Sequence, residues 1–354
     1  MKNQSNLHNI RVLDFTWVLA GPYATRLLAD YGAEVIKIQP LLPPEEDNTF
    51  TRGYYETWNR NKLGITLNLA KPEGIELVKK LVYISDAVVE NFTPHVMTNF
   101  GLDYENLKKL KPDIIMLSLS VMGGCKERSH YTGYAPTVHA LSGLTSMMSA
   151  GGRPAGPGFS FSDHIAGLFG VTRLLEAMEH RRQTGQGGHI ILSETTLIQD
   201  LLKDKPAAKY LEKLYRCKDS QWCAVTVEEN KEHQTLVNAI SKPVSSIDDL
   251  DKALEVLARE KTAAELMFFL RKAGITAGKI QDAASLANDP QLKARNFFKG
   301  TNKTFIDSES VKMDGRVKKN RPAPSPGRDN AYVYEKLLGL SRSETDSLHN
   351  SGVV

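Results

Sequence analysis

The alternation of strand-like and helix-like segments that begins at residue 10 constrains the fold more than any other feature of this sequence. Residues 10–16 form a short β-rich apolar run, residues 23–32 can form a helix that ends at Gly32, and residues 34–39 form a second apolar run. So short a connection between two strands is typical of a parallel βαβ unit, whose first loop lies at the carboxyl edge of the sheet.

The same alternation continues to about residue 193, which predicts a mostly parallel sheet with helices on both faces. Further strands are expected at 64–69, 87–92, 113–120 and 189–193, with helices at 71–86, 93–101 and 103–111. Residues 40–63 lack clear periodicity and predict a long loop, a feature that usually has a function or packs on an adjacent chain.

After about residue 204 the pattern changes. A hairpin is expected about residues 219–220, and amphipathic helices near 230–241, 247–259 and 262–273 follow it. This part of the chain therefore predicts a separate, smaller α+β unit.

The charge balance and the cysteine spacing exclude several classes of protein. The 45 basic and 41 acidic residues give a net charge of +4, which is too even to indicate nucleic-acid binding but is compatible with an anionic ligand. Cys125, Cys217 and Cys223 fit neither a zinc site nor a disulfide framework, although the last two could face each other across the hairpin. The first βα loop lacks the G-x-G-x-x-G fingerprint, so neither NAD nor FAD is expected.

No stretch approaches the ~18 consecutive apolar residues of a membrane span, and the first ten residues lack the apolar region of a signal peptide. We therefore expect a cytoplasmic protein that binds neither membrane nor nucleic acid and holds no metal.

A long helix is expected from Asp163 to Thr184, with Ser162 or Asp163 as its N-cap and Gly185 in the left-handed position that ends it. Its apolar residues recur at helical spacing and predict a core-facing side: Ile165, Leu168, Phe169, Val171, Leu174, Leu175 and Met178. The helix N-terminus stabilises the ionised form of the Asp163 carboxyl group, which is either a nucleophile or merely a cap.

Seven segments, spread in order over nearly the whole chain, resemble the family III CoA-transferases. This family includes formyl-CoA transferase, carnitine CoA-transferase and the α-methylacyl-CoA racemases. The matching segments are 12–40, 61–74, 88–97, 133–144, 162–167, 275–298 and 322–348.

The resemblance implies an α/β fold with a Rossmann-like, mostly parallel sheet in a large domain and a smaller α+β domain. Residues 1–203 would form the N-terminal part of the large CoA-binding domain and residues 204–310 the small domain. Residues 311–354 would return to the large domain. The family fold further implies an interlocked homodimer with the active site at the domain junction, or a heteromer with a related subunit.

The resemblance also implies the chemistry. Asp163 matches the nucleophilic aspartate of the transferases, which moves CoA from an acyl-CoA donor to a carboxylic acid acceptor through an aspartyl intermediate. Coenzyme A and acyl-CoA are then substrates, and no tightly bound cofactor is implied. The resemblance does not identify the donor and acceptor acids.

Residues that match the family's CoA-binding positions are Val18, Leu19, Ala20, Leu67, Asn91, Phe92, Thr93 and Tyr134. The alternative for each is structural: a tight turn, a strand end or, for Tyr134, a core tyrosine. Pro40 and Asn99 replace arginines of formyl-CoA transferase, so the phosphate contacts must differ in part. Lys62, Arg60 and Arg26 are candidates for them, unless they are solvated surface cations.

Two alternatives to a catalytic transferase remain. An α-methylacyl-CoA racemase would need a histidine where this chain has Tyr134, and His139 is either a substitute for it or a core residue. A non-catalytic CoA-binding subunit of a heteromeric transferase would not need Asp163.

Overall fold

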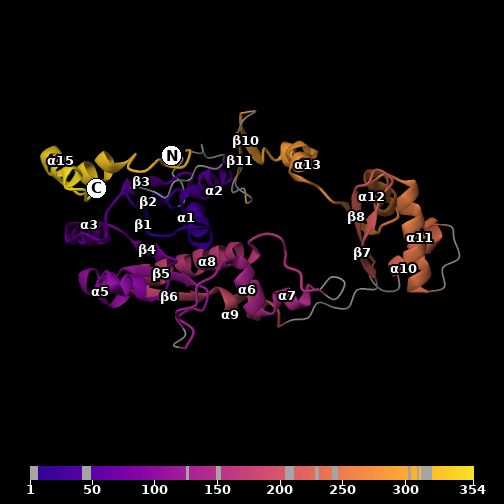
Figure 1. The fold of residues 1–354 in the computed structure, drawn as a ribbon, viewed down its shortest axis with the longest axis horizontal. Coiled ribbons are helices and arrows are strands. Elements are labelled where there is room, and N and C mark those ends of the chain that lie inside the picture. The colour runs from indigo at the N-terminus through magenta and orange to yellow at the C-terminus, as the bar shows by residue number, and fades with distance from the viewer. Residues whose placement is uncertain are drawn as a thin grey trace. The chain divides into compact units, whose positions relative to one another are not determined.

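A computed structural model describes residues 7–41, 49–124, 127–148, 153–203, 211–227, 231–240, 246–301, 304–308, 311 and 321–354. The prediction that concerns Cys125 lies outside these residues. The chain divides into two compact units, one of residues 1–203 with 311–354 and one of residues 204–310 (Figure 1).

A six-stranded parallel sheet forms the centre of the larger unit, which confirms the α/β fold. The strands follow the order β3-β2-β1-β4-β5-β6, and every neighbouring pair is parallel. Their bounds are β1 Arg11–Asp14, β2 Glu34–Gln39, β3 Leu63–Thr66, β4 Ala87–Glu90, β5 Ile115–Ser120 and β6 Gly188–Ser193. The order reverses between β1 and β4, and such a reversal opens a crevice beyond the carboxyl ends of the two strands.

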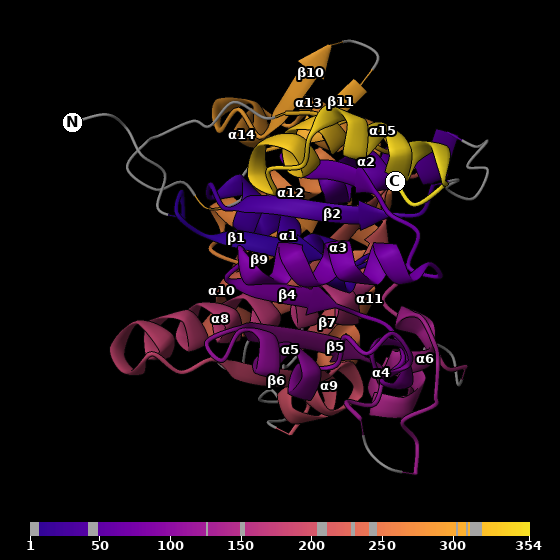
Figure 2. The ribbon, with the colours of Figure 1, turned by 90° about the vertical axis from the view of Figure 1, so that its left-hand side faces the viewer.

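Helices cover both faces of the sheet, as the alternation predicts. One face packs on α3 (Pro72–Tyr83), α5 (Tyr104–Leu110) and η1 (Tyr332–Leu337), and Figure 2 looks onto this face. The other packs on α1 (Ala20–Asp30) and α8 (Phe161–Thr184). Strands β1 to β5 are largely buried on both sides, which explains their continuous apolar runs, whereas β6, at the end of the sheet, is partly exposed.

This unit contains further helices. They are α4 His95–Asn99, α6 Ala135–Ser142, α7 Leu144–Met147, α9 Glu194–Leu201 and α15 Arg342–Asn350.

Residues 321–354 cover the edge strand β3. The Gly64 N–H donates to Asp329 Oδ2 at 2.9 Å, and the Thr66 N–H donates to Asn330 Oδ1 at 3.0 Å. Tyr334, fully buried, donates its hydroxyl to the Thr66 carbonyl at 2.6 Å. These bonds occupy backbone groups that an open sheet edge would leave unpaired.

The loop expected over residues 40–63 is wrong in part, because α2 (Thr49–Asn59) forms there. Tertiary contacts hold this helix where periodicity gave no signal. The Tyr55 hydroxyl donates to the Pro324 carbonyl at 2.8 Å, and Trp58 meets the His164 ring edge-on with centroids 5.2 Å apart.

The long helix α8 ends at Gly185 in the left-handed conformation (φ 74°), as predicted. Its apolar residues do not all face the core. Leu174 and Met178 are buried, whereas Leu168, Phe169 and Leu175 are 38–43% exposed. The apolar positions extend around the helix beyond a single stripe, so one side of them cannot reach the sheet.

The smaller unit has its own core. The predicted hairpin is confirmed as β7 (Leu211–Arg216) and β8 (Trp222–Val227), which pair antiparallel, and β9 (Thr276–Lys279) adds a third strand. Helices α10 Lys231–Ile240, α11 Ile247–Glu260 and α12 Ala263–Lys272 accompany this sheet. Cys217 and Cys223 lie in this core as free thiols.

Among its described residues, this unit also contains two short helices and a two-stranded sheet. These are α13 Ala283–Asn288, α14 Pro290–Ala294, β10 Phe298–Thr301 and β11 Thr304–Asp307.

Candidate active site

The loops that follow β1 and β4 meet at the point where the strand order reverses. The Trp17 N–H donates to Asn91 Oδ1 at 2.9 Å, and Asn91 Nδ2 donates to the Trp17 carbonyl, also at 2.9 Å. This reciprocal pair joins the segment with Val18 and Leu19 to the segment with Phe92 and Thr93. The structure thus brings together residues that were predicted from the sequence to lie at one edge of the sheet.

Val18 has an unusual backbone conformation in this loop. Its φ is +61°, a region that β-branched residues rarely adopt, and its side chain is 38% exposed. Strain of this kind costs on the order of 1–3 kcal/mol and persists only where the surroundings impose it. Contacts with the underlying sheet must therefore hold this loop in its conformation.

Asp14, at the end of β1, supplies that support. Its side chain accepts hydrogen bonds from the Thr16 N–H at 2.8 Å, from the Thr25 hydroxyl at 2.7 Å and from Lys62 Nζ at 2.8 Å. Lys37 Nζ lies 3.6 Å from Asp14 and donates to the Thr16 carbonyl. The start of the loop is thereby fixed to the sheet beneath it.

Asp14 and Lys62 are completely enclosed, and their pKa values differ from the ordinary ones. Burial alone would raise the pKa of Asp14, but the positive charges of Lys37 and Lys62 hold it well below its usual range. Burial lowers the pKa of Lys62 to about 7, against the opposing effect of Asp14. A buried carboxylate of this kind is stable only with its cations in place.

The phosphate-binding role considered for three cations is wrong, and so is the solvated alternative. Lys62 and Arg60 are 0% exposed and Arg26 is 4% exposed. Arg60 Nη2 lies 2.8 Å from Asp30 Oδ2, and Arg26 Nε lies 3.6 Å from the same oxygen. Each cation pairs with a buried carboxylate, and sequence spacing did not reveal those carboxylates.

Asp163 lies in the first turn of α8 but is not its N-cap. The helix begins at Phe161 with Ser160 as the N-cap residue, and no side chain caps it. Asp163 is 8% exposed, and its Oδ2 atom has no hydrogen-bond partner among the described residues. A cap would use its oxygens to bind helix N–H groups, so this free oxygen counts against the capping role.

Two opposing influences act on the Asp163 carboxyl group. Burial raises its pKa, while the backbone N–H groups of Asp163 itself and of Ala20, the nearby His164 and the Ser162 hydroxyl favour the ionised form. Ala20 is the first residue of α1. The N-termini of two helices thus lie at one carboxylate, where their dipoles stabilise negative charge.

Gly167 lets α1 and α8 approach this closely. A Cβ atom at residue 167 would lie 2.8 Å from Tyr23 Cδ1 and 2.9 Å from the Ala20 carbonyl oxygen. Residue 167 lies one helical turn after Asp163, and a residue larger than glycine there would have to displace Tyr23 or the backbone of α1. The glycine in the matched segment 162–167 therefore has a packing role that brings Ala20 to Asp163.

Two further ionisable groups interact with Asp163. Glu194, the first residue of α9, is 7% exposed, and burial together with the Asp163 charge raises its pKa to about 8. Tyr54 of α2 has its pKa raised to about 12, first by burial and then by Asp163. The sequence analysis did not identify either residue. Glu194 directly follows the carboxyl end of the parallel strand β6, which is the signal that could have pointed to it.

His139 is a buried residue of α6 with a defined role. Its Nε2 atom accepts a hydrogen bond from the Ser162 N–H at 3.3 Å, and burial lowers its pKa. It is 3% exposed. The neutral imidazole therefore binds one of the free N–H groups at the start of α8.

The remaining predicted residues differ in exposure. Leu67 is 2% exposed and packs in the core, so only its backbone is left to meet a ligand. Tyr134 precedes α6 and is 64% exposed, which excludes the core alternative within this chain. Phe92 donates its N–H to Glu90 Oε2 at 2.8 Å, and Thr93 follows it in the same loop.

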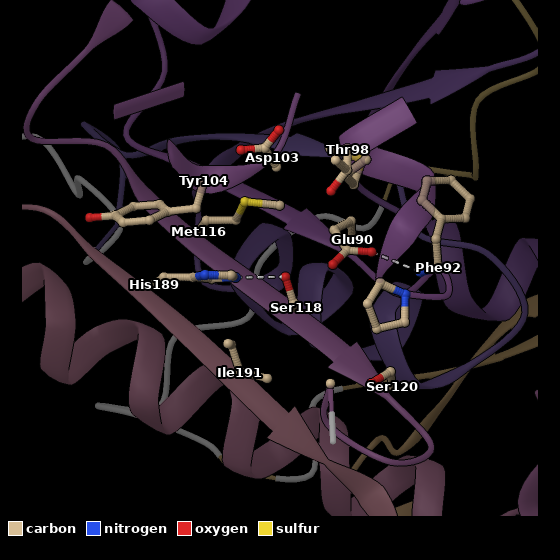
Figure 3. Close-up of a pocket in the computed structure, with 13 residues that line it drawn as sticks. Glu90, Phe92, Thr98, Asp103, Tyr104, Met116, Ser118, Ser120, His189 and Ile191 are labelled. Atoms are coloured by element: carbon tan, nitrogen blue, oxygen red, sulfur yellow. Dashed lines mark hydrogen bonds between the residues drawn. The ribbon is translucent and has the colours of Figure 1, made fainter. Parts of the chain in front are cut away.

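A cavity of about 140 Å³ lies on the α5 side of the sheet, next to Phe92 (Figure 3). Ser118 Oγ and His189 Nε2 face each other across β5 and β6 at 3.0 Å, and Tyr104 stacks on the His189 ring. Burial raises the pKa of Glu90 to about 7. The cavity is on the opposite face of the sheet from α8.

No group of three or more metal-binding side chains occurs among the described residues. Within the same residues, no helix has both the length and the apolar character that a bilayer crossing requires.

Comparison with known proteins gives a consistent result. The sequence profile described as CoA-transferase family III matches residues 7–330. A probable CoA-transferase of Mycobacterium tuberculosis is 27% identical over 397 residues, covering 98% of this chain, and the chain spans only 50% of that protein. An acetyl-CoA:oxalate CoA-transferase of Acetobacter aceti is 31% identical over 363 residues, with 89% of this chain and 90% of that protein covered.

The fold is also shared with a solved structure. A CaiB/BaiF family protein from Brucella suis superimposes with a TM-score of 0.83 at 24% identity, covering 95% of this chain and 100% of that one. With the profile match over most of the sequence, these findings show that the chain belongs to CoA-transferase family III and is a CoA-transferase.

Proposed function

We propose that this enzyme transfers CoA between carboxylic acids through a covalent intermediate on Asp163. The Asp163 carboxylate attacks the thioester carbonyl of the donor, the C–S bond breaks, and CoA leaves as its thiolate, so an acyl-aspartyl anhydride remains. The thiolate then attacks the Asp163 carbonyl and releases the donor carboxylate. The resulting aspartyl-CoA thioester passes CoA to the acceptor by the same steps in reverse.

The observation that carries this proposal is the Oδ2 atom of the almost buried Asp163, which has no hydrogen-bond partner within the described part of the chain. Buried carboxylate oxygens nearly always have partners, and an exception is explained when the oxygen must attack a substrate. Burial raises the pKa of Asp163, and the nearby hydrogen-bond donors and His164 oppose this rise by favouring the ionised, nucleophilic form.

The Ala20 N–H supports the same role. It lies at the start of α1, close enough to Asp163 to favour its ionised form. A backbone donor held in this position can also stabilise the oxyanions that form when the carboxylate and the thiolate attack. Elsewhere the loss of one such donor costs ~2.7–4 kcal/mol of activation free energy.

We assign CoA binding to the larger unit, at the crevice where the loops after β1 and β4 meet. Asn91 and the backbone of Val18, Leu19 and Ala20 would hold the CoA chain, and Phe92 and Thr93 adjoin it. Tyr134, which precedes α6 and has an exposed side chain, is also proposed to contact CoA. The phosphate contacts must come from residues other than Lys62, Arg60 and Arg26.

We also propose that the enzyme works as an oligomer, either an interlocked homodimer or a heteromer with a related subunit. The support within this chain is the exposed apolar side of α8, formed by Leu168, Phe169 and Leu175. Apolar residues grouped on one helix face are typical of a protein interface. Sedimentation of the purified chain would distinguish a dimer from a monomer that needs a second subunit.

Racemase activity is less well supported. His139 Nε2 already binds the Ser162 N–H, so this nitrogen is not available to remove a proton from a substrate. We expect no deuterium at the α-carbon of 2-methylacyl-CoA substrates in deuterated water. Deuterium incorporation that disappears in His139→Ala would instead favour the racemase.

The transferase proposal is tested by exchange kinetics over a panel of acyl-CoA donors and carboxylic acids, followed by mass spectrometry. We expect ping-pong kinetics, with a donor acid released before the acceptor binds. Kinetics that require both substrates to be bound together would contradict the covalent route.

A further inference from the structure

Glu90 is a buried carboxyl group that contacts the loop after β4 directly. It is the last residue of β4 and is 4% exposed. Its side chain lies at the cavity on the α5 side of the sheet, and its Oε2 atom accepts the Phe92 N–H at 2.8 Å (Figure 3). The carboxyl group therefore binds the backbone two residues further along, at the point where the strand becomes the loop.

Asn91, the residue between them, is held by a different segment. Its side chain accepts from the Trp17 N–H and donates to the Trp17 carbonyl, each at 2.9 Å. The Trp17 and Phe92 rings also lie near each other, with centroids 6.5 Å apart. The loop is thus fixed both by the segment after β1 and by Glu90.

From this arrangement we infer that Glu90 is a positioning residue for CoA binding, whose carboxylate holds residues 91–93 in the conformation that CoA requires. It would act on the affinity for CoA and not on the reaction at Asp163. The inference rests on the proposed function, because the assignment of CoA to this loop is part of that proposal.

The charge of Glu90 decides how firmly it holds the loop. A hydrogen bond to an ionised carboxylate is roughly twice as strong as one to a neutral oxygen. Burial raises the pKa of Glu90 to about 7, while the Ser118 hydroxyl and the Phe92 N–H favour the ionised form by donating to it. The loop should therefore be held firmly above pH 7 and less firmly below it.

The neighbouring strands respond to the same change of charge. Ser118 Oγ lies 3.0 Å from His189 Nε2, and the hydroxyl has one proton, which it can donate either to Glu90 or to His189. When Glu90 is ionised, Ser118 donates to it and His189 Nε2 donates to Ser118. Protonated Glu90 can itself donate to Ser118, which reverses the direction of both bonds. Burial lowers the pKa of His189 against the charges of Glu105 and Asp103, which favours the neutral ring that both arrangements require.

Further ionisable groups lie on the elements around Glu90: Asp14 of β1, His95 of α4, and Asp103, Tyr104, Glu105 and Lys108 of α5. Asp103 caps α5, and Asp14 accepts from a hydroxyl of α1 on the other face of the sheet. His95 Nε2 lies 3.5 Å from the Thr93 hydroxyl. Because His95 contacts the same loop, the pH response needs a control at that residue.

Binding of free CoA tests the inference without any chemistry at Asp163. The dissociation constant for the full chain is measured by isothermal titration calorimetry at intervals from pH 6 to pH 8. Glu90→Gln keeps an oxygen that can accept the Phe92 N–H but carries no charge, so it should behave like the protonated enzyme at every pH. The ionisation of CoA itself is common to both proteins and cancels in the ratio of their dissociation constants.

The change of this ratio with pH is the expected result. At pH 8 Glu90→Gln should bind CoA about fivefold more weakly than the unaltered enzyme, as expected when a neutral hydrogen bond replaces a charge-assisted one. At pH 6 the two proteins should bind CoA almost equally. A ratio that does not change with pH would overturn the inference.

Ser118→Ala is a second variant, which keeps Glu90 and carries the test if Glu90→Gln does not fold. It removes a donor to the ionised carboxylate, so the pKa of Glu90 rises and the step in CoA affinity should move to a higher pH. His95→Gln should leave the step in place, and Glu76→Gln, an exposed carboxyl group on α3, should leave CoA affinity unchanged. A step that moves in His95→Gln and not in Ser118→Ala would overturn the inference.

Exchange kinetics give an independent readout. With an acyl-CoA donor that the enzyme accepts, Glu90→Gln at pH 8 should raise KM for that donor and keep kcat, because the nucleophile is unaltered. A fall in kcat with an unchanged KM would contradict a role in CoA affinity.

Asn91→Ala separates this inference from the proposed function. If Asn91→Ala weakens CoA binding and Glu90→Gln does not, only the role of Glu90 is wrong. If Asn91→Ala binds CoA as tightly as the unaltered enzyme, the assignment of CoA to this loop fails, and the inference fails with it.

Discussion

Two buried polar clusters of the larger unit differ in whether their atoms have partners. Around Asp14, the Thr16 N–H, the Thr25 hydroxyl and Lys62 Nζ all donate to the carboxylate. Around Asp163, by contrast, Asp163 Oδ2 and Thr195 Oγ1 have no hydrogen-bond partner among the residues that the structure describes. Both clusters are almost inaccessible to water, so burial alone does not distinguish them.

The difference distinguishes a cluster that supports the fold from a cluster that takes part in the reaction. A fully bonded buried ion cluster fixes its loop and costs stability when one member is removed. A buried group without a partner lowers stability in the free enzyme and is retained where a substrate can use it. We therefore expect changes in the Asp14 cluster to affect folding and changes in the Asp163 cluster to affect catalysis.

The largest effect is expected from Asp163→Ala, which removes the nucleophile. CoA exchange should fall by on the order of 10⁴-fold, while the free energy of unfolding in urea changes by less than ~1 kcal/mol. Asp200→Ala, an exposed carboxylate on α9, is the control and should retain activity. Substantial CoA exchange by a folded Asp163→Ala protein would mean that Asp163 is not the nucleophile, and that the two clusters do not differ in the way proposed.

Lys62→Met should have the opposite profile. Removal of this cation leaves Asp14 buried with only Lys37 to offset its charge, and the free energy of unfolding should fall by about 3 kcal/mol. The control is Lys79→Met, whose side chain is 36% exposed on α3. An unchanged urea midpoint would mean that the Asp14 cluster is not a stabilising support.

Gly167→Ala should moderately reduce both the stability of the protein and its rate of CoA exchange. The added Cβ would lie within 3 Å of Tyr23 and of the Ala20 carbonyl, so α1 must move away from α8. We expect a loss of ~1–3 kcal/mol in stability from overpacking and a clear loss of exchange rate, because the Ala20 N–H retreats from Asp163. Gly278→Ala, where the Cβ meets no atom within 4 Å, is the control.

The smallest effect near neutral pH is expected from mild acidification. Asp163 must be ionised to attack, and its pKa lies above the ordinary aspartate value, so exchange should begin to fall at a higher pH than for a solvated aspartate. The pKa of Asp14 is depressed, so its contribution to stability is present above about pH 4 and is lost only as the pH falls through its folded-state value. Parallel pH titrations of exchange rate and of unfolding should therefore separate, with activity lost first.

The alternating part of the fold could be predicted from the sequence. Strand β2 has the predicted bounds of residues 34–39, and Gly185 ends α8 as expected. Local signals were strong there, because strands buried on both faces carry unbroken apolar runs. Helix α2 could not be predicted, since its stability depends on contacts with residues such as Pro324 that are distant in the sequence.

The candidate site was predictable only in its main features. The resemblance pointed to Asp163 and to the loops with Val18 and Asn91, but the buried position of Lys62 depends on Asp14, 48 residues away. Glu194 was missed because nothing local shows that α9 brings it to Asp163. Long-range pairing of charges is decided by packing, and a single sequence does not contain that information directly.

The most direct test of the central claim is to trap the covalent state of Asp163. The enzyme is incubated with donor acyl-CoA and no acceptor, then treated with hydroxylamine or borohydride, digested and analysed by mass spectrometry. We predict a hydroxamate or an alcohol on Asp163, found only in the peptide that contains Phe161 to Arg173, because an anhydride or thioester there reacts and a free carboxylate does not. Full-rate transfer without any adduct on this peptide would contradict the account and leave Asp163 with an electrostatic role only.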